Sequence, residues 1–226
     1  MQKKFGIINI ILISLVLALD TIYACVGGLW LKGLTSLGFV SIGIINLVFM
    51  YKCSAEERKF GIIMLIGLVF AMLGDIVLNV FFEGGAVLFA IGHIFYLVAY
   101  CQLVSFKWTD LIAGISIFIP SILFITLAPI FDFGGLFMEM VCIVYALIIS
   151  VMVGKAITNL IKDHSLVNLI LVIGSALFFF SDLMLLLNVF AGLPRVIDIL
   201  CIATYYPAQC LLAGSLYLVG LKYLNK

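Results

Sequence analysis

The chain has 226 residues, of which 66% are hydrophobic and 10% are charged, and its mean hydropathy is +1.38. Soluble domains average about 45–50% apolar and about 25% charged residues, so this chain has too few polar side chains to cover a water-facing surface. The composition excludes a soluble enzyme, a nucleic-acid-binding protein and a disordered chain. A membrane-spanning helix needs about 20 residues, so the length allows about eight spans and no sizeable soluble domain.

Apolar runs separated by polar residues, glycine or proline predict eight transmembrane helices in one membrane domain over residues 1–226. Backbone polar groups in lipid must be satisfied internally, and runs this long and this apolar achieve that as helices. The first run follows Lys3 and Lys4, as in a signal peptide, but similar runs follow it, so we expect it to be kept as a span. The predicted spans are residues 5–24, 33–51, 60–82, 84–105, 108–129, 134–154, 166–190 and 198–221.

The basic residues predict a multi-pass protein of a bacterial-type cell membrane with both termini in the cytoplasm. Cytoplasmic loops and ends of membrane proteins carry an excess of lysine and arginine. With both termini inside, ten of the 12 basic residues lie on the inner side, and only Lys32 and Arg195 lie outside. The longest inner loop is predicted at residues 155–165. The inner residues are Lys3, Lys4, Lys52, Arg58, Lys59, Lys107, Lys155, Lys162, Lys222 and Lys226.

A weak internal repeat links the third and seventh predicted spans. The segment LGDIVLNVF at residues 73–81 is similar to FSDLMLLLNVF at residues 180–190. Both spans run from inside to outside, so the chain can consist of two parallel four-helix halves related by duplication. Chance similarity between two helices rich in leucine, valine and phenylalanine is the alternative, and the sequence leaves both open.

Four ionisable side chains lie well inside predicted spans: Asp75, His93, Glu139 and Asp182. An ionisable group at the bilayer centre costs roughly 2.5–3.5 kcal/mol on insertion scales, so such groups should face protein or water. The predicted direction of each span places the three acids in the outer half of the membrane and His93 near the midplane or slightly outward, together with other polar side chains. We therefore expect one polar cavity in the outer half. The other polar residues are Lys32, Asn79, Tyr205, Tyr206 and Gln209.

Each of these residues also has a structural interpretation. Asp75 and Asp182 can hold helices together by hydrogen bonds, although two unpaired acids are a costly way to do so. His93 can be a structural hydrogen-bond donor. Glu139 can extend to the outer surface, and Lys32 can be an interfacial anchor.

The residue types inside the spans limit the chemistry. One histidine is too few for a membrane zinc hydrolase, and neither a GxSxG motif nor a glycine-rich phosphate loop is present. The six cysteines are scattered without a CxxC pair, so we expect no metal and no organic cofactor. Two carboxylic acids in a low-dielectric cavity can differ in protonation, one neutral and one ionised. That combination suits acid-catalysed cleavage through an oxocarbenium-like state.

Five segments carry a resemblance to a known family. In this order and at these span positions, the sequence resembles the YhhN-like transmembrane lysoplasmalogenase family over nearly its whole length. One departure is Gly33, where the family often has proline after the lysine. The segments are LKGLT at 31–35, LGDIVL at 73–78, AIGHIFY at 90–96, GSALFFFSD at 174–182 and TYYPAQ at 204–209.

The resemblance implies an eight-span, metal-independent hydrolase that cleaves the vinyl ether bond of lysoplasmalogens. The products would be a fatty aldehyde and glycerophosphocholine or glycerophosphoethanolamine. Asp75 or Asp182 would protonate the vinyl carbon while the other stabilises the oxocarbenium, and His93 would assist water. The expected partner is a lysophospholipid in the bilayer, with no nucleic acid and no obligatory protein partner. The expected substrate-binding residues are Lys32, Asn79, Glu139, Ser181, Tyr205, Tyr206 and Gln209.

Two other classes of function stay open from the sequence. Acids within the membrane and an internal repeat also suit a transporter for small solutes or lipids. Against transport, the inner halves of the spans have little polar lining beyond Ser14 and Asn46. A lipid-binding or purely structural membrane protein is the second alternative, and it predicts that Asp75 and Asp182 tolerate replacement by asparagine.

Overall fold

The computed structural model describes residues 2–224; Lys226, one of the basic residues that predict the orientation, lies outside them. The described residues form eight α-helices that are long and apolar enough to cross a membrane, and no strand. This confirms the prediction of an all-α, multi-pass membrane protein. The helices are α1 (Gln2–Val26), α2 (Leu29–Phe49), α3 (Ala55–Val77), α4 (Phe82–Leu103), α5 (Trp108–Leu127), α6 (Leu136–Lys162), α7 (Leu166–Ala191) and α8 (Arg195–Leu224), with a short 3₁₀ turn, η1 (Met50–Lys52), after α2.

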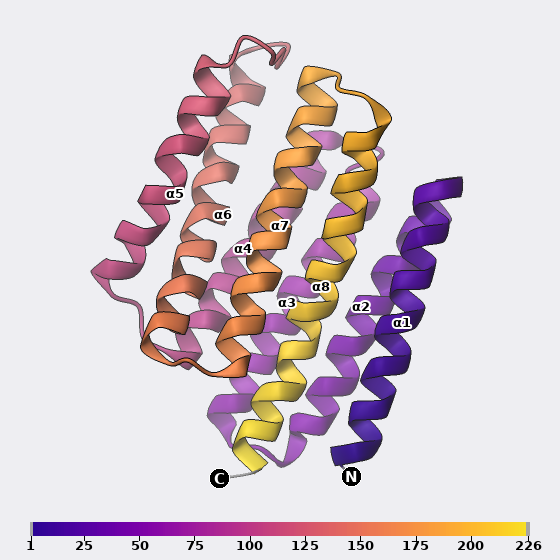
Figure 1. The fold of residues 1–226 in the computed structure, drawn as a ribbon, viewed down its shortest axis with the longest axis vertical. Helices are drawn as coiled ribbons and strands as arrows, with labels where there is room; N and C mark the ends of the chain where they lie inside the picture. Colours follow the sequence, from indigo (N-terminus) through magenta and orange to yellow (C-terminus); the bar gives the residue numbers. More distant parts are fainter. Residues whose placement is uncertain (1, 225–226) are drawn as a thin grey trace.

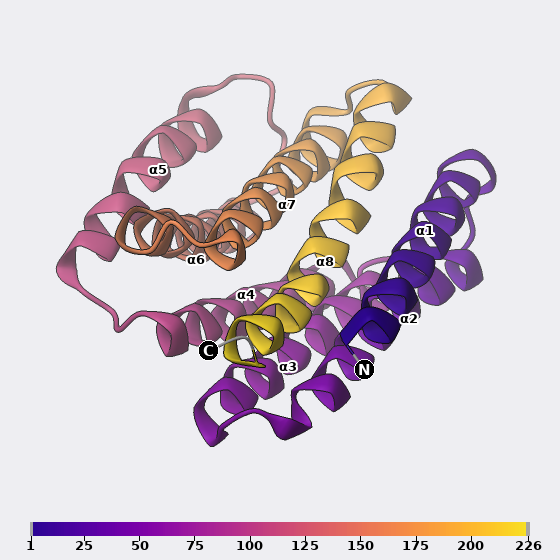
Figure 2. The same ribbon diagram turned by 60° about the horizontal axis from the view of Figure 1, so that its bottom comes forward.

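The helices run up and down in one bundle, with both chain ends at the same end (Figure 1). We call this the termini end and the opposite one the far end. Consecutive helices pack in the pairs α1–α2, α3–α4, α5–α6 and α7–α8, and α2–α8 and α4–α6 contacts join these pairs. Among the described helices α5 contacts only α6, and Figure 2 shows it at the edge of the bundle. The cytoplasmic location of the termini stays a prediction.

The outside of the bundle is apolar, as contact with lipid requires. Large hydrophobic side chains are exposed on every helix from α1 to α8. The only two tryptophans, Trp30 and Trp108, are 93% and 79% exposed. Trp30 lies at the far end of α2 and Trp108 at the termini end of α5. Tryptophan is enriched at the two membrane–water interfaces, and these positions at opposite ends of the bundle agree with that preference.

Glycines allow close helix contacts inside the bundle. A side-chain carbon at Gly154 of α6 would lie 2.7 Å from Cα of Gly114 on α5. One at Gly92 of α4 would lie 3.2 Å from the carbonyl oxygen of Gly67 on α3. Small residues let helix backbones approach and gain van der Waals contact, which stabilises helix pairs in lipid.

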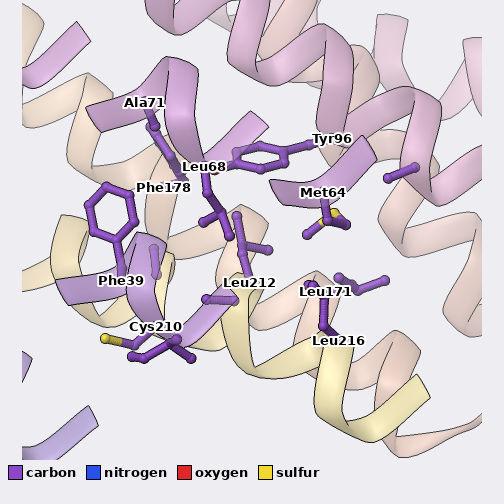
Figure 3. Packing of buried hydrophobic residues seen from close by; sticks show 14 of the residues in the cluster. Phe39, Met64, Leu68, Ala71, Tyr96, Leu171, Phe178, Cys210, Leu212 and Leu216 are labelled. Carbon is purple, nitrogen blue, oxygen red and sulfur yellow. The ribbon is translucent and has the colours of Figure 1, made fainter. Parts of the chain in front are cut away.

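The centre of the bundle is filled by apolar side chains from α3, α7 and α8 (Figure 3). We call Met64, Leu68, Leu171, Leu212 and Leu216 the central core, and each is fully buried. At 1.5 Å of rise per residue, their positions along the helices place them in the middle and the termini half of the bundle. The central core therefore separates the far end from the termini end.

The predicted loop at residues 155–165 is wrong, because α6 continues to Lys162. Lys155, counted above among the loop residues, is fully buried inside α6. Its Nζ donates to Asp110 Oδ2 at 2.7 Å and to the Ser105 carbonyl at 3.1 Å. Asn159 Nδ2 similarly donates to a backbone carbonyl of α4 at 2.9 Å. The polar side chains that suggested a loop in the sequence are therefore buried in a helix, where they form hydrogen bonds with neighbouring parts of the protein.

The predicted third span ends at residue 82, but α3 ends at Val77. Asn79 thus lies in the turn before α4, and its Nδ2 donates to the backbone carbonyl of Asp75 at 2.6 Å. The turn is tight, since a side-chain carbon at Gly85 would lie 2.5 Å from Cα of Leu78. The amide of Asn79 therefore helps to close the end of α3.

The expectation of a nearly apolar inner half is also wrong for the termini half. Asn9 and Asn46 exchange two side-chain hydrogen bonds of 2.7 and 2.8 Å between α1 and α2. The hydroxyls of Tyr100 and Ser175 lie 2.8 Å apart between α4 and α7. These groups pair with one another, so they hold helices together.

Candidate functional site

A cavity of about 70 Å³ lies toward the far end of the bundle, between α1, α2, α3, α4, α7 and α8. We call it the polar cavity, because lysine, aspartate and tyrosine side chains line it. Asp75 and Asp182 both face it, as the sequence predicts. Its polar lining residues are Tyr23, Lys32, Asp75, Ser181, Asp182, Asp198, Cys201, Tyr205 and Tyr206.

Asp75 is buried and surrounded by donors. Ser36 Oγ on α2 donates to its Oδ2 at 2.6 Å, and Tyr205 Oη on α8 donates to the same oxygen at 2.8 Å. Lys32 Nζ lies 3.9 Å from the other oxygen, Oδ1. The hydroxyl of Tyr206 lies 3.5 Å from Ser36 Oγ. Asp75 therefore has the surroundings of a carboxylate that accepts hydrogen bonds beside a cation.

Asp182 has a different set of partners. Tyr145 Oη on α6 donates to its Oδ2 at 2.7 Å, and His93 Nε2 on α4 lies 3.3 Å from the same oxygen. His93 Nε2 and Tyr145 Oη are themselves 2.8 Å apart, so the three groups form a triangle. Among the described residues no lysine or arginine forms an ion pair with Asp182. Asp182 can therefore exchange protons with two neighbours that both carry and accept them.

His93 is held in one orientation by packing. Its side chain is fully buried, and its ring meets that of Phe178 edge to face with centroids 4.5 Å apart. Within residues 2–224 its Nδ1 has no hydrogen-bond partner. A proton on Nε2 reaches Tyr145 or Asp182, whereas a proton on Nδ1 would lack an acceptor. The surroundings therefore favour the neutral tautomer with its proton on Nε2.

The structure brings together only part of the predicted site. Ser181 lines the polar cavity with its hydroxyl donating to the Cys201 carbonyl at 3.0 Å. Gln209 lies deeper in the bundle, where its Oε1 accepts from Tyr96 Oη at 2.9 Å. Asn79 lies in the turn after α3, and Glu139 lies half-buried near the start of α6. The predicted residues that do not line the polar cavity are Asn79, His93, Glu139 and Gln209, and His93 contacts Asp182 from behind the wall.

The two nearest donors to the aspartates were not expected from the sequence. Ser36 directly follows the LKGLT segment, and serine in an apolar helix commonly bonds to its own backbone. Tyr145 is an isolated tyrosine in an apolar run. The depth of such a residue follows from the span, but the direction of its side chain depends on how α6 packs.

The chemistry available at the polar cavity comes from carboxylates, an imidazole, phenols and an amine. The six cysteines are free thiols. In the part of the chain that the structure describes, no group of three histidine, cysteine, aspartate or glutamate side chains is arranged to hold a metal ion. The described residues thus provide proton transfer and electrostatic stabilisation.

A second, larger cavity of about 470 Å³ meets the site from the side of α5 and α6. We call it the apolar groove. Tyr145 and Asp182 form its polar side next to the site, and Asp182 lines both the polar cavity and the apolar groove. The other lining residues are Ser116, Ile117, Pro120, Ser121, Phe124, Ile125, Cys142, Ala146, Ile149, Phe179, Leu183 and Leu186.

Comparison with known families identifies the chain. Residues 35–216 match the YhhN family, which is well over half of the sequence. The chain therefore belongs to the YhhN family, and the resemblance seen in its five segments is confirmed. No curated protein and no solved structure matches it. The matched region covers both aspartates and their hydroxyl and imidazole partners, and it begins three residues after Lys32.

Proposed function

We propose that this member of the YhhN family is a hydrolase that cleaves the vinyl ether bond of a lysoplasmalogen within the membrane. The products are a fatty aldehyde and glycerophosphocholine or glycerophosphoethanolamine. The observation that carries the proposal is the unlike pair of carboxylates on one polar cavity. Asp75 lies beside Lys32, whereas Asp182 lies beside His93 and Tyr145.

We assign the role of proton donor to Asp182. Vinyl ether hydrolysis begins when a proton adds to the carbon β to the ether oxygen, which leaves an oxocarbenium at the adjacent carbon. Asp182 can deliver that proton and regain one through His93 and Tyr145, because both lie within hydrogen-bond reach of its Oδ2. General acid–base groups at such distances contribute about 10²–10⁴-fold to a rate.

We assign the role of ionised partner to Asp75. Its Oδ2 accepts two hydroxyl hydrogen bonds and its Oδ1 lies near an ammonium group. A fixed carboxylate in a cavity that is shielded from water stabilises a developing positive charge more strongly than solvent does. Asp75 thus favours formation of the oxocarbenium.

The remaining steps return every group to its starting state. Water adds to the oxocarbenium carbon, and its proton passes to the Asp182 carboxylate, directly or through His93. In the resulting hemiacetal the carbon–oxygen bond to glycerol breaks as that oxygen takes the proton from Asp182. The hemiacetal hydroxyl returns its proton to the Asp182 carboxylate as it becomes the aldehyde, so Asp182 ends protonated, as it began. No cofactor is consumed.

Lys32 is the proposed contact for the phosphate group. It lies near the far end of α2, and its side chain is 13% exposed beside the polar cavity. An ammonium is a strong partner for a phosphate oxygen. Tyr205 and Tyr206 also line this cavity, and they are the proposed contacts for the glycerol oxygens.

The packing of the termini half favours hydrolysis over transport. The central core lies between the polar cavity and the termini end, and its side chains are fully buried. A solute that crossed the membrane through this bundle would have to displace Leu68, Leu212 and Leu216. A flux measurement in proteoliposomes separates the two functions, since the hydrolase predicts no solute flux above protein-free vesicles.

Hydrolysis in D₂O tests the proposed chemistry directly. Protonation of the vinyl carbon predicts one deuterium on the carbon next to the aldehyde group, detected by mass spectrometry after immediate reduction to the alcohol. A saturated alkyl ether analogue has no double bond to protonate and should stay intact. Aldehyde without that deuterium, or cleavage of the saturated analogue, would contradict the mechanism.

A further inference from the structure

We propose that the apolar groove binds the single aliphatic chain of the substrate, and that the chain enters sideways from the bilayer between α5 and α7. This inference rests on the proposed function and names the subsite that it requires. The vinyl ether joins a polar glycerol to an apolar chain. Asp182 lies where the polar cavity meets the apolar groove. A substrate with its glycerol in the cavity and its chain in the groove would therefore have its vinyl ether next to Asp182.

The wall of the groove is suited to a hydrocarbon. Its two serine hydroxyls, of Ser116 and Ser121, donate to carbonyls of their own helix and so offer a ligand no free donor. The volume of about 470 Å³ falls within the roughly 300–1,000 Å³ of small-molecule pockets. Its apolar contact surface includes Ile117, Phe124, Ile149, Phe179, Leu183 and Leu186.

The groove runs along the bundle axis past the site, since Leu186 on α7 and Phe124 on α5 line it nearer the far end. Tyr145 and Asp182 each lie nine residues from the far end of their helices, which is about 14 Å at 1.5 Å per residue. Ile149 lies one turn further toward the termini end on α6, and Ser116 lies in the termini half of α5. A chain in this groove would lie parallel to the chains of the surrounding lipid, with its head group toward Lys32.

The side of the groove between α5 and α7 is not closed by helix packing. Among the described helices α5 contacts α6 and no other, and Figure 2 shows α5 at the edge of the bundle. Pro120 lies within α5 and lines the groove. Proline removes one backbone hydrogen bond from a helix interior, so the wall is most easily bent at this position.

The dimensions also favour a lipid with one chain. The polar cavity of about 70 Å³ has no space for a second hydrocarbon chain beside the head group. The apolar groove is a single channel bounded by α5, α6 and α7. The occupant that we infer is a single-chain lipid whose chain lies in the apolar groove, whose reactive bond lies at Asp182 and whose phosphate lies toward Lys32.

Photolabelling tests the groove without depending on catalysis. The probe is a saturated alkyl ether lysophosphocholine with a diazirine at the end of its chain, which has no vinyl ether to cleave. We expect labelled peptides from residues 116–125 of α5 and 146–149 of α6, with labelling reduced by excess unlabelled lysolipid. Labelling spread over α1 and α2, or labelling that competition does not reduce, would overturn the proposal.

A groove-filling variant provides the second test. Ser116→Phe places a ring in the groove, and we expect at least about tenfold lower kcat/KM for the longest chain with a shift toward shorter chains. Thr126→Phe is the matched control, because Thr126 is exposed on α5 outside the groove and also bonds to its own helix. Equal effects of the two variants, or an unchanged chain preference, would contradict the assignment.

The two tests distinguish the groove from the proposed function. Labelling in the groove without aldehyde from any vinyl ether would retain the single-chain lipid site and refute the hydrolase. Aldehyde release with labelling elsewhere would support the hydrolase and refute the groove as the chain site.

Discussion

Asp75 and Asp182 occupy equivalent settings in the two halves of the chain. Asp75 lies on the third helix of the first half and accepts a hydroxyl hydrogen bond from Ser36 on α2. Asp182 lies on the third helix of the second half and accepts one from Tyr145 on α6. Each aspartate thus receives a hydroxyl from the second helix of its own half.

The fourth helix of each half contacts the aspartate of the other half. Tyr205 on α8 donates to Asp75, and His93 on α4 lies within 3.3 Å of Asp182. The packing contacts match as well, because the α2–α8 contact joins the second helix of one half to the fourth helix of the other, and the α4–α6 contact does the same. This is the arrangement that duplication of a four-helix unit produces, and it agrees with the repeat between residues 73–81 and 180–190. The two settings differ in Lys32 and His93, which gives the aspartates different chemistry.

We predict that Asp75→Asn lowers kcat by about 10²–10³-fold with a smaller change in KM. The amide keeps the shape of the side chain but removes the charge that stabilises the oxocarbenium. Steady-state kinetics on a lysoplasmalogen measure the change. Asp132→Asn, in the exposed connection before α6, should leave kcat unchanged; near-normal turnover by Asp75→Asn would remove Asp75 from the mechanism.

We predict that Tyr145→Phe lowers kcat about tenfold or more. The substitution removes the hydroxyl that lies 2.7 Å from Asp182 and 2.8 Å from His93, and hydrogen bonds to charged groups contribute about 1.5–3 kcal/mol. Tyr217→Phe is the control, because that hydroxyl donates to the Gln2 carbonyl at the termini end. If both variants behaved alike, the triangle around Asp182 would have no special role.

We predict that Lys32→Gln impairs hydrolysis of a lysoplasmalogen more than that of an alkenylglycerol without phosphate. The ammonium should contribute to KM only when the substrate carries the anion that it binds. Comparison of kcat/KM for the two substrates separates this role from the effect of Lys32 on Asp75. An equal loss on both substrates would mean that Lys32 acts only through Asp75.

We predict that Lys155→Met destabilises the protein by about 3–5 kcal/mol, because it leaves Asp110 buried without its closest cation. Thermal unfolding in detergent measures the effect. Lys162→Met is the control; Lys162 bonds to the other oxygen of Asp110 at 2.8 Å but is partly exposed, so we expect about 1 kcal/mol or less. The double variant Lys155→Met with Asp110→Leu should regain stability, and a further loss would refute the buried pair.

We predict that Cys25 reacts with a membrane-impermeant maleimide in intact cells. This thiol is exposed and lies near the far end of α1, which faces outward if both termini are cytoplasmic. A variant that retains only Cys25 should be labelled directly. A cysteine at His164 in the same background, at the termini end, should need permeabilised cells, and the reverse result would invert the orientation.

The sequence was sufficient for the helices, because runs of about 20 apolar residues in lipid have few alternatives to an α-helix. It was also sufficient for the depth of Asp75, Asp182 and Lys32, because depth follows from position along a span. All three line one cavity. Depth alone was not sufficient, because Glu139, predicted in the same half, does not line the cavity.

The sequence did not predict which side chains face one another. Gln209 lies four residues after Tyr205, yet it bonds to Tyr96 deeper in the bundle while Tyr205 reaches Asp75. The helix α6 extended past Lys155 because Asp110 on another helix neutralises that lysine. Both outcomes depend on neighbours that are distant in the sequence.

The most direct test of the central claim is release of fatty aldehyde from a lysoplasmalogen by the purified protein, measured beside the Asp182→Asn variant. We predict sustained aldehyde release by the unaltered protein and at least about a hundredfold less by the variant, with equal thermal stability. A folded protein that releases no aldehyde would refute vinyl ether hydrolysis, and a variant that matches it in turnover would refute the role of Asp182.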